Sequence, residues 1–156
     1  MSKRIAKMHA AVRDARRDHL HKASTKLIRE NQAICVENLA VSNMVKHPHL
    51  ARRICDAAWR ELRSMLEYKA ALYGRSFAVV NRWLPTSKRC SGCGYTRESL
   101  PLSARALRCP RCGAERDRDI NAARNILAAG MAQLHSTAGH AGHAGMHACQ
   151  APKGAT

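Results

Sequence analysis

Two pairs of cysteines constrain this fold more than any other feature of the sequence. Each pair has the spacing C-x-x-C, and fifteen residues lie between the two pairs. The four residues are Cys90, Cys93, Cys109 and Cys112. Two thiolates three positions apart on a tight turn can face one ion, and a glycine that tolerates positive φ follows each pair, at Gly94 and Gly113. The spacing therefore predicts a four-cysteine zinc ribbon.

Four thiolates complete a tetrahedral zinc site, so the predicted site is structural and leaves no position open for a substrate. Unrelated thiols are the alternative interpretation. A thioredoxin-like redox site fits less well, because a single C-x-x-C serves that chemistry and neither pair opens a helix of a βαβ unit. Two further cysteines, Cys35 and Cys55, fall in apolar patterns and are predicted to pack as small hydrophobic residues.

The excess of positive charge is the second constraint. Lysine and arginine together number 27 against 11 acidic residues, which gives a formal net charge of +16. Such an excess favours a polyanionic partner, usually DNA or RNA, while a merely basic or ribosome-associated protein is the alternative. The predicted phosphate contacts come from a basic N-terminal helix and from the residues before the first cysteine. They are Arg13, Arg16, Arg17, Lys22, Lys88 and Arg89.

The chain shows no sign of a membrane or secretory segment. No run approaches the roughly 18 consecutive apolar residues that a membrane span needs. The first residues contain no apolar h-region, so they do not form a secretory signal peptide. We therefore expect a cytoplasmic protein without a membrane partner, whose cysteines are thiols or metal ligands. The sequence leaves the oligomeric state open.

Apolar periodicity predicts an α/β fold. Residues 2–30 repeat apolar side chains every three or four positions, which is typical of an amphipathic helix whose apolar stripe packs on a sheet or another helix. Two short apolar, β-prone runs, 33–41 and 76–83, are predicted strands. Between them, residues 49–73 have a helical pattern, and Gly74 is a predicted C-cap. This order of elements indicates a βαβ-like unit.

Composition divides the chain into four parts. Residues 1–83 hold the predicted helices and strands just described. Residues 84–117 hold the four cysteines and have little helical period. Residues 118–132 return to a helical pattern, which Gly130 is predicted to stop. Residues 133–156 are rich in glycine, alanine and histidine and are predicted to be disordered.

Three acidic residues stand in unusual places. Glu37 lies at the end of the first predicted strand, and Asp117 and Asp119 lie between the cysteine-rich part and the last predicted helix. If that helix packs beside the strand, Glu37 and one aspartate converge on a divalent cation, and carboxylates are the ligands that Mg²⁺ prefers. A pair of such ions supports phosphodiester cleavage. A carboxylate before a helix is more often an N-cap, which is the alternative interpretation.

A set of motifs resembles a known family. The chain is similar to the C-terminal half of the OrfB/TnpB transposase-associated proteins of bacterial insertion sequences, which are themselves similar to type V CRISPR nucleases. The resemblance covers residues 5–130 and rests on the order of the motifs. In this sequence they read HLHKASTKLI, ICVENLAVSNM, DAAWRELRSMLEYKAALYGR, PTSKRCSGCG, CPRCG and DRDINAARNIL.

This resemblance implies a ribonuclease H-like (RuvC) nuclease domain, present here in part, with an inserted four-cysteine zinc ribbon. It also implies RNA-guided cleavage of DNA with Mg²⁺, carried by three carboxylates. On the family's motifs, one carboxylate falls on Glu37 and the last on Asp119, with Asp117 as its near neighbour. Residues 1–83 and 118–132 are then segments of the RuvC-like domain.

The sequence departs from the family at its start. The family's first catalytic Asp lies in a G-I-D-x-G type motif, and neither this motif nor the domains that hold the guide RNA occur here. We therefore expect an N-terminally truncated member that binds DNA or RNA and cleaves neither by itself, since a two-metal site that loses a ligand loses most activity. A nuclease completed by another chain, a non-catalytic zinc-ribbon regulatory module and a non-functional remnant are the alternatives.

Overall fold

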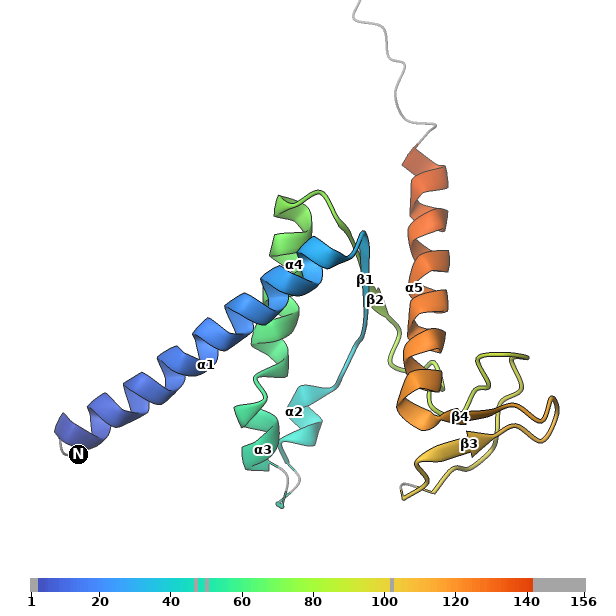
Figure 1. Cartoon of the computed structure of the whole chain (residues 1–156), viewed down its shortest axis with the longest axis horizontal. Helices are drawn as coiled ribbons and strands as arrows, with labels where there is room; N and C mark the ends of the chain where they lie inside the picture. Colours follow the sequence, from blue (N-terminus) through green and yellow to red (C-terminus); the bar gives the residue numbers. More distant parts are fainter. Residues whose placement is uncertain (1–2, 47, 50, 102, 142–156) are drawn as a thin grey trace, which may run out of the picture.

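The computed structural model describes residues 3–46, 48–49, 51–101 and 103–141. It shows a mixed α/β chain, as the apolar pattern predicts, with a long helix near each end (Figure 1). None of the described helices is both long and apolar enough to cross a bilayer. The elements in chain order are α1 (Lys3–Glu30), β1 (Ala33–Glu37), α2 (Val41–Met44), α3 (Ala51–Asp56), α4 (Trp59–Leu72), β2 (Ser76–Val80), β3 (Ala106–Arg108), β4 (Glu115–Asp117) and α5 (Arg118–Ala141).

The strands β1 and β2 form a parallel two-stranded sheet, as the predicted βαβ unit requires. Both are short runs of mostly apolar, β-prone side chains. The register pairs Ala33 with Ser76 and Glu37 with Val80, and the N–H of Asn38 donates to the carbonyl oxygen of Val80 at 3.0 Å. Glu37 is thereby held at the carboxyl end of β1, beside the end of β2.

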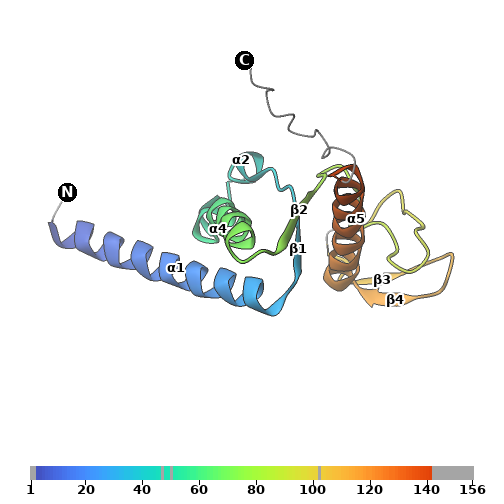
Figure 2. The same cartoon turned by 90° about the horizontal axis from the view of Figure 1, so that it is seen from above.

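Helices cover both faces of this sheet. Figure 2 shows α1 and α4 on one side of the strands and α5 on the other. A small core forms where α1 and α4 meet, and Ile28, Leu66 and Ala70 are almost completely buried in it. Four partly buried apolar side chains pack around this core: Ile34, Val36, Leu62 and Phe77. Cover on both faces explains why both strands are apolar along most of their length.

Only the second half of α1 packs as its apolar stripe predicts. Ser24 and Ile28 are fully buried, whereas Ile5, Met8 and Val12 are 46%, 63% and 50% exposed. The first half of the helix projects away from the body in both views (Figures 1 and 2). The expectation of a fully packed stripe is therefore wrong for residues 5–12, whose apolar side chains stay roughly half exposed.

The predicted helix 49–73 is interrupted. The helix α3 ends at Asp56 and α4 begins at Trp59, because Ala58 adopts a left-handed conformation with φ 48° and ψ 41°. A residue in that conformation cannot continue a right-handed helix. The end of α4 agrees with the prediction, since Gly74 follows it with φ +62°.

Both strands are shorter than their apolar runs predict. The strand β1 ends at Glu37 and β2 ends at Val80. After β2 the chain turns at once, because the N–H of Leu84 donates to the carbonyl oxygen of Asn81 at 3.1 Å. This turn leads into the cysteine-rich segment.

Gly130 does not stop the last helix, which continues to Ala141. Instead, Gly130 lies against β1: a Cβ placed on it would stand 2.7 Å from the Cβ of Cys35 and closer still to its Sγ. The glycine therefore permits a close approach of α5 to the sheet, a role that helical periodicity does not reveal. Residues 133–141, predicted as the start of a disordered tail, belong to this helix, and residues 142–156 lie outside the described residues.

Candidate metal centres and nucleic-acid surface

The four predicted zinc ligands converge. Their sulfur atoms all lie within 4.8 Å of one another, and this is the only group of three or more possible metal-binding His, Cys, Asp or Glu side chains among the described residues. The Cys90 and Cys112 sulfurs are 3.8 Å apart, and those of Cys93 and Cys109 are 3.6 Å apart. A tetrahedron with Zn–S bonds of about 2.3 Å has edges of about 3.8 Å, so the donor set fits a four-thiolate zinc ion.

Each cysteine pair sits at the tip of a small antiparallel hairpin. Arg89 bridges to Thr96 around the first pair, and Arg108 of β3 pairs with Glu115 of β4 around the second. These two hairpins bring four thiols from separate parts of the sequence to one point.

The backbone repeats the same turn in both hairpins. The N–H of Gly94 donates to the carbonyl oxygen of Cys90, and that of Gly113 donates to Cys109, both at 2.9 Å. The two glycines have φ values of +76° and +71°, as the sequence predicts for these positions. The backbone N–H of Cys112 lowers the pKa of the Cys109 thiol to about 6, because it donates to the thiolate. At Cys93 the backbone N–H of Tyr95 acts in the same direction, but burial and the other three thiols outweigh it and raise the pKa to about 11. The turn thus favours the ionised form at Cys109 and not at every cysteine of the cluster.

Two asparagines of α5 fasten the first hairpin to the rest of the fold. The side-chain oxygen of Asn121 accepts from the N–H of Ser91 at 2.8 Å, and its amide donates to the carbonyl oxygen of Arg89 at 2.7 Å. The amide of Asn125 donates to the carbonyl oxygens of Thr86 and Arg89 at 2.8 and 2.6 Å. Both asparagines are buried. Sequence reasoning missed this role, although their spacing of four on one helix face was a usable signal.

The carboxylate of Glu37 opens onto a cavity. Glu37 is half-buried and lines a space of about 480 Å³ bounded by β1, α2, α4 and α5. The α5 residues on this cavity are Ala123 and Ile126. Asp119 lies four positions before Ala123 in the same helix. It therefore lies on the same helix face as Ala123 and Ile126, one turn closer to the start of α5. The cavity lining therefore joins Glu37 to Ala123 and Ile126 of α5 and does not include Asp119, which is exposed at the start of that helix.

Asp117 serves as an N-cap. Its Oδ1 accepts from the backbone N–H groups of Asp119 and Ile120 at 2.8 and 3.1 Å, which is the pattern of a capping side chain. The capping interpretation therefore holds for Asp117. Within the described part of the chain, neither Asp119 nor Glu37 has a hydrogen bond or ion pair through its carboxylate. Those two carboxylates remain available to a cation.

The cavity that holds Glu37 is rich in positive charge. Arg60, Arg63 and Arg82 line it together with apolar side chains. Arg63 donates to the side-chain oxygen of Asn38 at 3.1 Å, which fixes its position near the end of β1. The three guanidinium groups of this cavity suit an anionic ligand such as a phosphate. The one carboxylate suits a cation that is bound to the same ligand.

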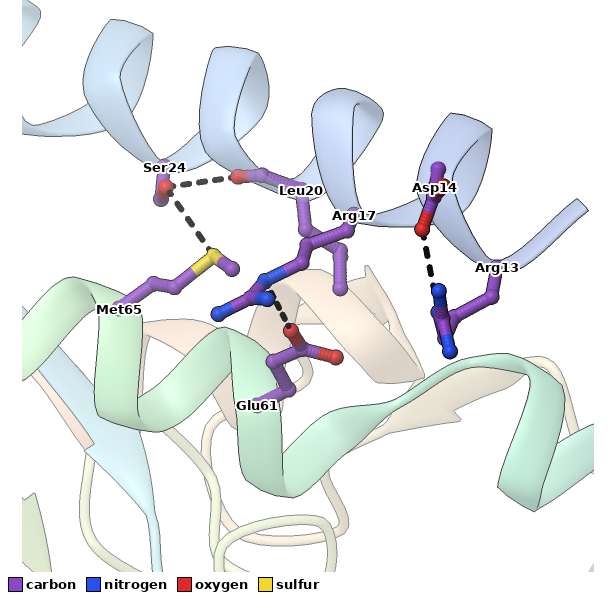
Figure 3. Close-up of polar contacts among 7 residues, drawn as sticks. All are labelled: Arg13, Asp14, Arg17, Leu20, Ser24, Glu61 and Met65. Atoms are coloured by element: carbon purple, nitrogen blue, oxygen red, sulfur yellow. Dashed lines mark hydrogen bonds and ion pairs between the residues drawn. The ribbon is translucent and has the colours of Figure 1, made fainter. Parts of the chain in front are cut away.

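The predicted phosphate-binding residues of α1 all have acidic neighbours. Arg16 pairs with Asp56 at 2.9 Å, and Arg17 pairs with Glu61 of α4 at 3.3 Å (Figure 3). Two further pairs lie within the helix, Arg13 with Asp14 and Lys22 with Asp18. The four basic side chains are all at least half exposed, and their acidic partners are at least 43% exposed. Exposed ion pairs contribute little stability, so their cations can exchange carboxylates for phosphates.

The two predicted contacts before the first cysteine also have roles inside the fold. Lys88 donates to the carbonyl oxygen of Glu98 at 2.9 Å. The backbone oxygen of Arg89 accepts from two asparagines of α5, while its guanidinium lies beside the turn at Gly94. The binding of nucleic acid by these residues stays a prediction.

A buried lysine joins α1 to α4. Lys69 is 5% exposed, and its ammonium donates to the carbonyl oxygen of His21, to Ser24 Oγ and to Thr25 Oγ1 at 2.7, 2.7 and 2.8 Å. Figure 3 shows Ser24 turned toward Met65 of α4 at this contact. Burial lowers the pKa of Lys69. Sequence reasoning did not single out this lysine, because lysine on an amphipathic helix normally faces solvent.

Two family models match the chain. One is described as "Probable transposase" and matches residues 1–47, and the other is described as "Cas12f1-like, TNB domain" and matches residues 59–126. The first match includes Glu37. The second includes the four cysteines and Asp119. The candidate residues therefore lie within the matched segments.

Curated relatives agree with these models. The chain is 57% identical over 130 residues to a "Putative RNA-guided DNA endonuclease" of Streptomyces pristinaespiralis, covering 83% of this chain and 32% of that protein. It is 37% identical over 147 residues to "Putative RNA-guided DNA endonuclease InsQ" of Escherichia coli K12, covering 85% of this chain and 36% of that protein. The chain thus spans about a third of the length of these relatives.

A solved structure has the same fold. The chain superposes on a cryo-EM structure of a Cas12f1–sgRNA–target DNA complex with a TM-score of 0.63 at 21% identity, covering 80% of this chain and 36% of that one. The order of motifs, the matching models and the relatives all point the same way. The chain belongs to the OrfB/TnpB family of transposase-associated proteins, which includes the relatives named as putative RNA-guided DNA endonucleases.

Proposed function

We propose that the chain binds nucleic acid and supplies part of a RuvC-like, Mg²⁺-dependent nuclease site, with Glu37 and Asp119 as two of its metal ligands. The observation that carries this proposal is the position of Glu37, at the carboxyl end of β1, on a basic cavity walled by the α5 face that bears Asp119. The relatives named as putative RNA-guided DNA endonucleases support the assignment of the substrate to DNA.

The residues present suit Mg²⁺ by their chemistry. The ion prefers carboxylate oxygens, and both carboxylates lack partners within the described residues. When bound, it would lower the pKa of a water ligand and stabilise the leaving oxygen of a phosphodiester. Glu37 would hold the ion at the sheet, and the arginines of the cavity would orient the phosphate. The four cysteines would hold a separate, structural zinc ion that fixes the two hairpins beside α5.

We further propose that the chain alone does not cleave DNA or RNA. Among the described residues no three carboxylates lie close enough together to hold one ion, and Asp117 is already engaged as a helix cap. Two carboxylates hold Mg²⁺ weakly, and in-line displacement needs the attacking and leaving oxygens placed accurately. The same observations favour one alternative, a zinc-ribbon module that binds nucleic acid and regulates without catalysis.

A cleavage assay tests this proposal. Single-stranded and duplex DNA and RNA are incubated with the chain and Mg²⁺ or Mn²⁺, and the same reactions are run with Glu37→Gln and Asp119→Asn. Glu67→Gln is the matched control, because Glu67 is an exposed glutamate of α4 outside the cavity. We expect no turnover by any of the four proteins. Turnover that persists in Glu67→Gln and vanishes in both site variants would show an active nuclease.

A second assay distinguishes a partial site from a binding module. The site proposal predicts that Mn²⁺ binds weakly to the chain, measured by its paramagnetic effect, and that Glu37→Gln and Asp119→Asn each weaken this binding while Glu67→Gln leaves it unchanged. Equal Mn²⁺ binding by all four proteins would contradict a shared metal site and favour the regulatory module.

A further inference from the structure

We propose that Trp83, with Arg82 beside it, forms a stacking platform that holds one base of a single-stranded DNA at the entrance of the Glu37 cavity. The choice of DNA rests on the proposed function. The platform itself rests on the exposure, rigidity and charge of this turn.

The exposure of Trp83 is unusual. Its side chain is 83% exposed, more than any other large hydrophobic residue in the described part of the chain, and the chain has only two tryptophans. Trp59, the other one, is 43% exposed and lines the cavity. A large aromatic ring in water gains free energy when a flat apolar surface covers it, and a nucleobase is such a surface.

The turn that presents Trp83 is held at both ends. The backbone N–H of Trp83 donates to Asn81 Oδ1 at 3.0 Å, and the N–H of Leu84 donates to the Asn81 carbonyl oxygen at 3.1 Å. On one side the turn continues β2, and on the other Asn125 holds the carbonyl oxygen of Thr86. The indole is therefore presented by fixed backbone, so stacking on it orders little of the chain.

Charge identifies the kind of partner. Arg82 precedes Trp83 and lines the cavity with Glu37, and within the described residues its guanidinium has no hydrogen bond or ion pair. An arginine adjacent to an exposed aromatic ring offers a phosphate contact next to a stacking surface, which is the pattern used by single-strand-binding proteins. The net charge of +16 favours a polyanion such as nucleic acid over a neutral protein partner.

A single strand fits this platform better than a duplex. Bases in a duplex already stack on their neighbours, so covering Trp83 with one of them requires unstacking. An unpaired base has a free face for the indole. The phosphate next to that base then meets Arg82 at the cavity entrance, which directs the strand toward Glu37.

Binding measurements with the full chain test the platform. The affinities of oligo(dT), of a duplex and of oligo(U) of equal length are measured by fluorescence anisotropy for the wild type, Trp83→Ala and Trp83→Phe. We expect Trp83→Ala to weaken oligo(dT) binding about 5- to 150-fold, the range that loss of one stacked base gives. Trp83→Phe should retain most of the affinity, and duplex binding should change less than about twofold.

A spectroscopic readout separates stacking from simple charge attraction. In a Trp59→Phe background Trp83 is the only tryptophan, and oligo(dT) should quench its fluorescence. An abasic oligonucleotide with the same phosphates should bind without quenching. Arg82→Gln should weaken both oligonucleotides equally, because it removes a phosphate contact.

Several results would overturn the platform. They are absent quenching, equal loss of single-strand and duplex affinity in Trp83→Ala, or equal affinities of Trp83→Phe and Trp83→Ala. A larger effect of Trp83→Ala on oligo(U) than on oligo(dT) would contradict the assignment to DNA. Bound zinc and circular dichroism verify that each variant is folded. Glu37→Gln should leave quenching intact, so failure of the metal site is distinguished from failure of the platform.

Discussion

The side-chain amide of Asn125 lies 2.6 Å from the carbonyl oxygen of Arg89, one residue before Cys90, the first of the four clustered cysteines. This hydrogen bond joins α5, the helix that carries the candidate carboxylate Asp119 in its first turn, to the hairpin that carries Cys90. The position of the two cysteine-bearing hairpins relative to the cavity therefore depends on one helix face, where Asn121 adds a parallel contact to the same carbonyl oxygen.

We predict that Asn125→Ala destabilises the docking of this hairpin. The change removes a donor from the buried carbonyl oxygen of Thr86 and from the partly buried one of Arg89, which costs about 1–3 kcal/mol. Chemical denaturation should show this loss, and hydrogen exchange should increase at residues 85–91 more than in β1. Asn31→Ala is the control, because Asn31 is exposed and its amide bonds only within the same turn of chain. Equal effects of the two variants would contradict the predicted role of Asn125.

Zinc content gives a second prediction. The purified chain should contain about one zinc ion, as a closed four-thiolate site requires. The Cys109→Ser, Cys112→Ser double variant should lose it, whereas Cys55→Ser should keep it, because Cys55 is an exposed thiol outside the cluster. A chelator should unfold the two hairpins, since metal binding supplies their folding free energy. Full zinc content in the double variant, measured by elemental analysis, would disprove the assignment.

The local features of this fold were predictable from the sequence. The C-x-x-C pairs and the glycines after them specify the hairpin tips, because ligand spacing and positive φ are properties of a few adjacent residues. The strands that begin at Ala33 and Ser76 follow likewise from short apolar runs. Glu37 was placed correctly at a strand end for the same reason.

Features that depend on distant contacts were not predictable in this way. Gly130 has the local signature of a helix end, but its absent side chain serves a contact with Cys35, almost a hundred positions away in the sequence. The helix break at Ala58 contains no glycine or proline, so the sequence holds no local signal that predicts it. Lys69 looks like a solvent-facing residue until α1 is seen to supply three oxygen acceptors for it.

The buried Lys69 gives a prediction with a defined pH dependence. Lys69→Ala should lower the free energy of unfolding by about 2–4 kcal/mol, because it removes three hydrogen bonds and leaves a cavity between α1 and α4. Lys26→Ala, at an exposed position of α1, is the control. Denaturant titrations of both variants measure the difference.

The sign of the pH effect follows from burial. Since burial lowers the pKa of Lys69 below its usual 10.5, the folded chain binds fewer protons than the unfolded chain between the lowered value and 10.5. The Lys69 contribution to the free energy of unfolding therefore rises with pH through this window. The stability difference between wild type and Lys69→Ala should widen as pH increases there, and a difference that narrows would contradict burial of the charged form.

Salt dependence and the Arg17–Glu61 pair give the last prediction. Phosphate contacts release counterions, so the affinity of the chain for any oligonucleotide should fall steeply as salt increases, and Arg17→Ala should reduce the slope of log affinity against log salt by about 1.

Arg17 pairs with Glu61 at 3.3 Å and remains 66% exposed, so the carboxylate competes with phosphate for the same guanidinium. Glu61→Gln should therefore tighten binding at low salt, and this gain should vanish in the Arg17→Ala background. Filter binding over a range of salt concentrations measures all four combinations. If Glu61→Gln tightens binding equally with and without Arg17, the gain comes from the net charge alone, and Arg17 does not contact the phosphate backbone.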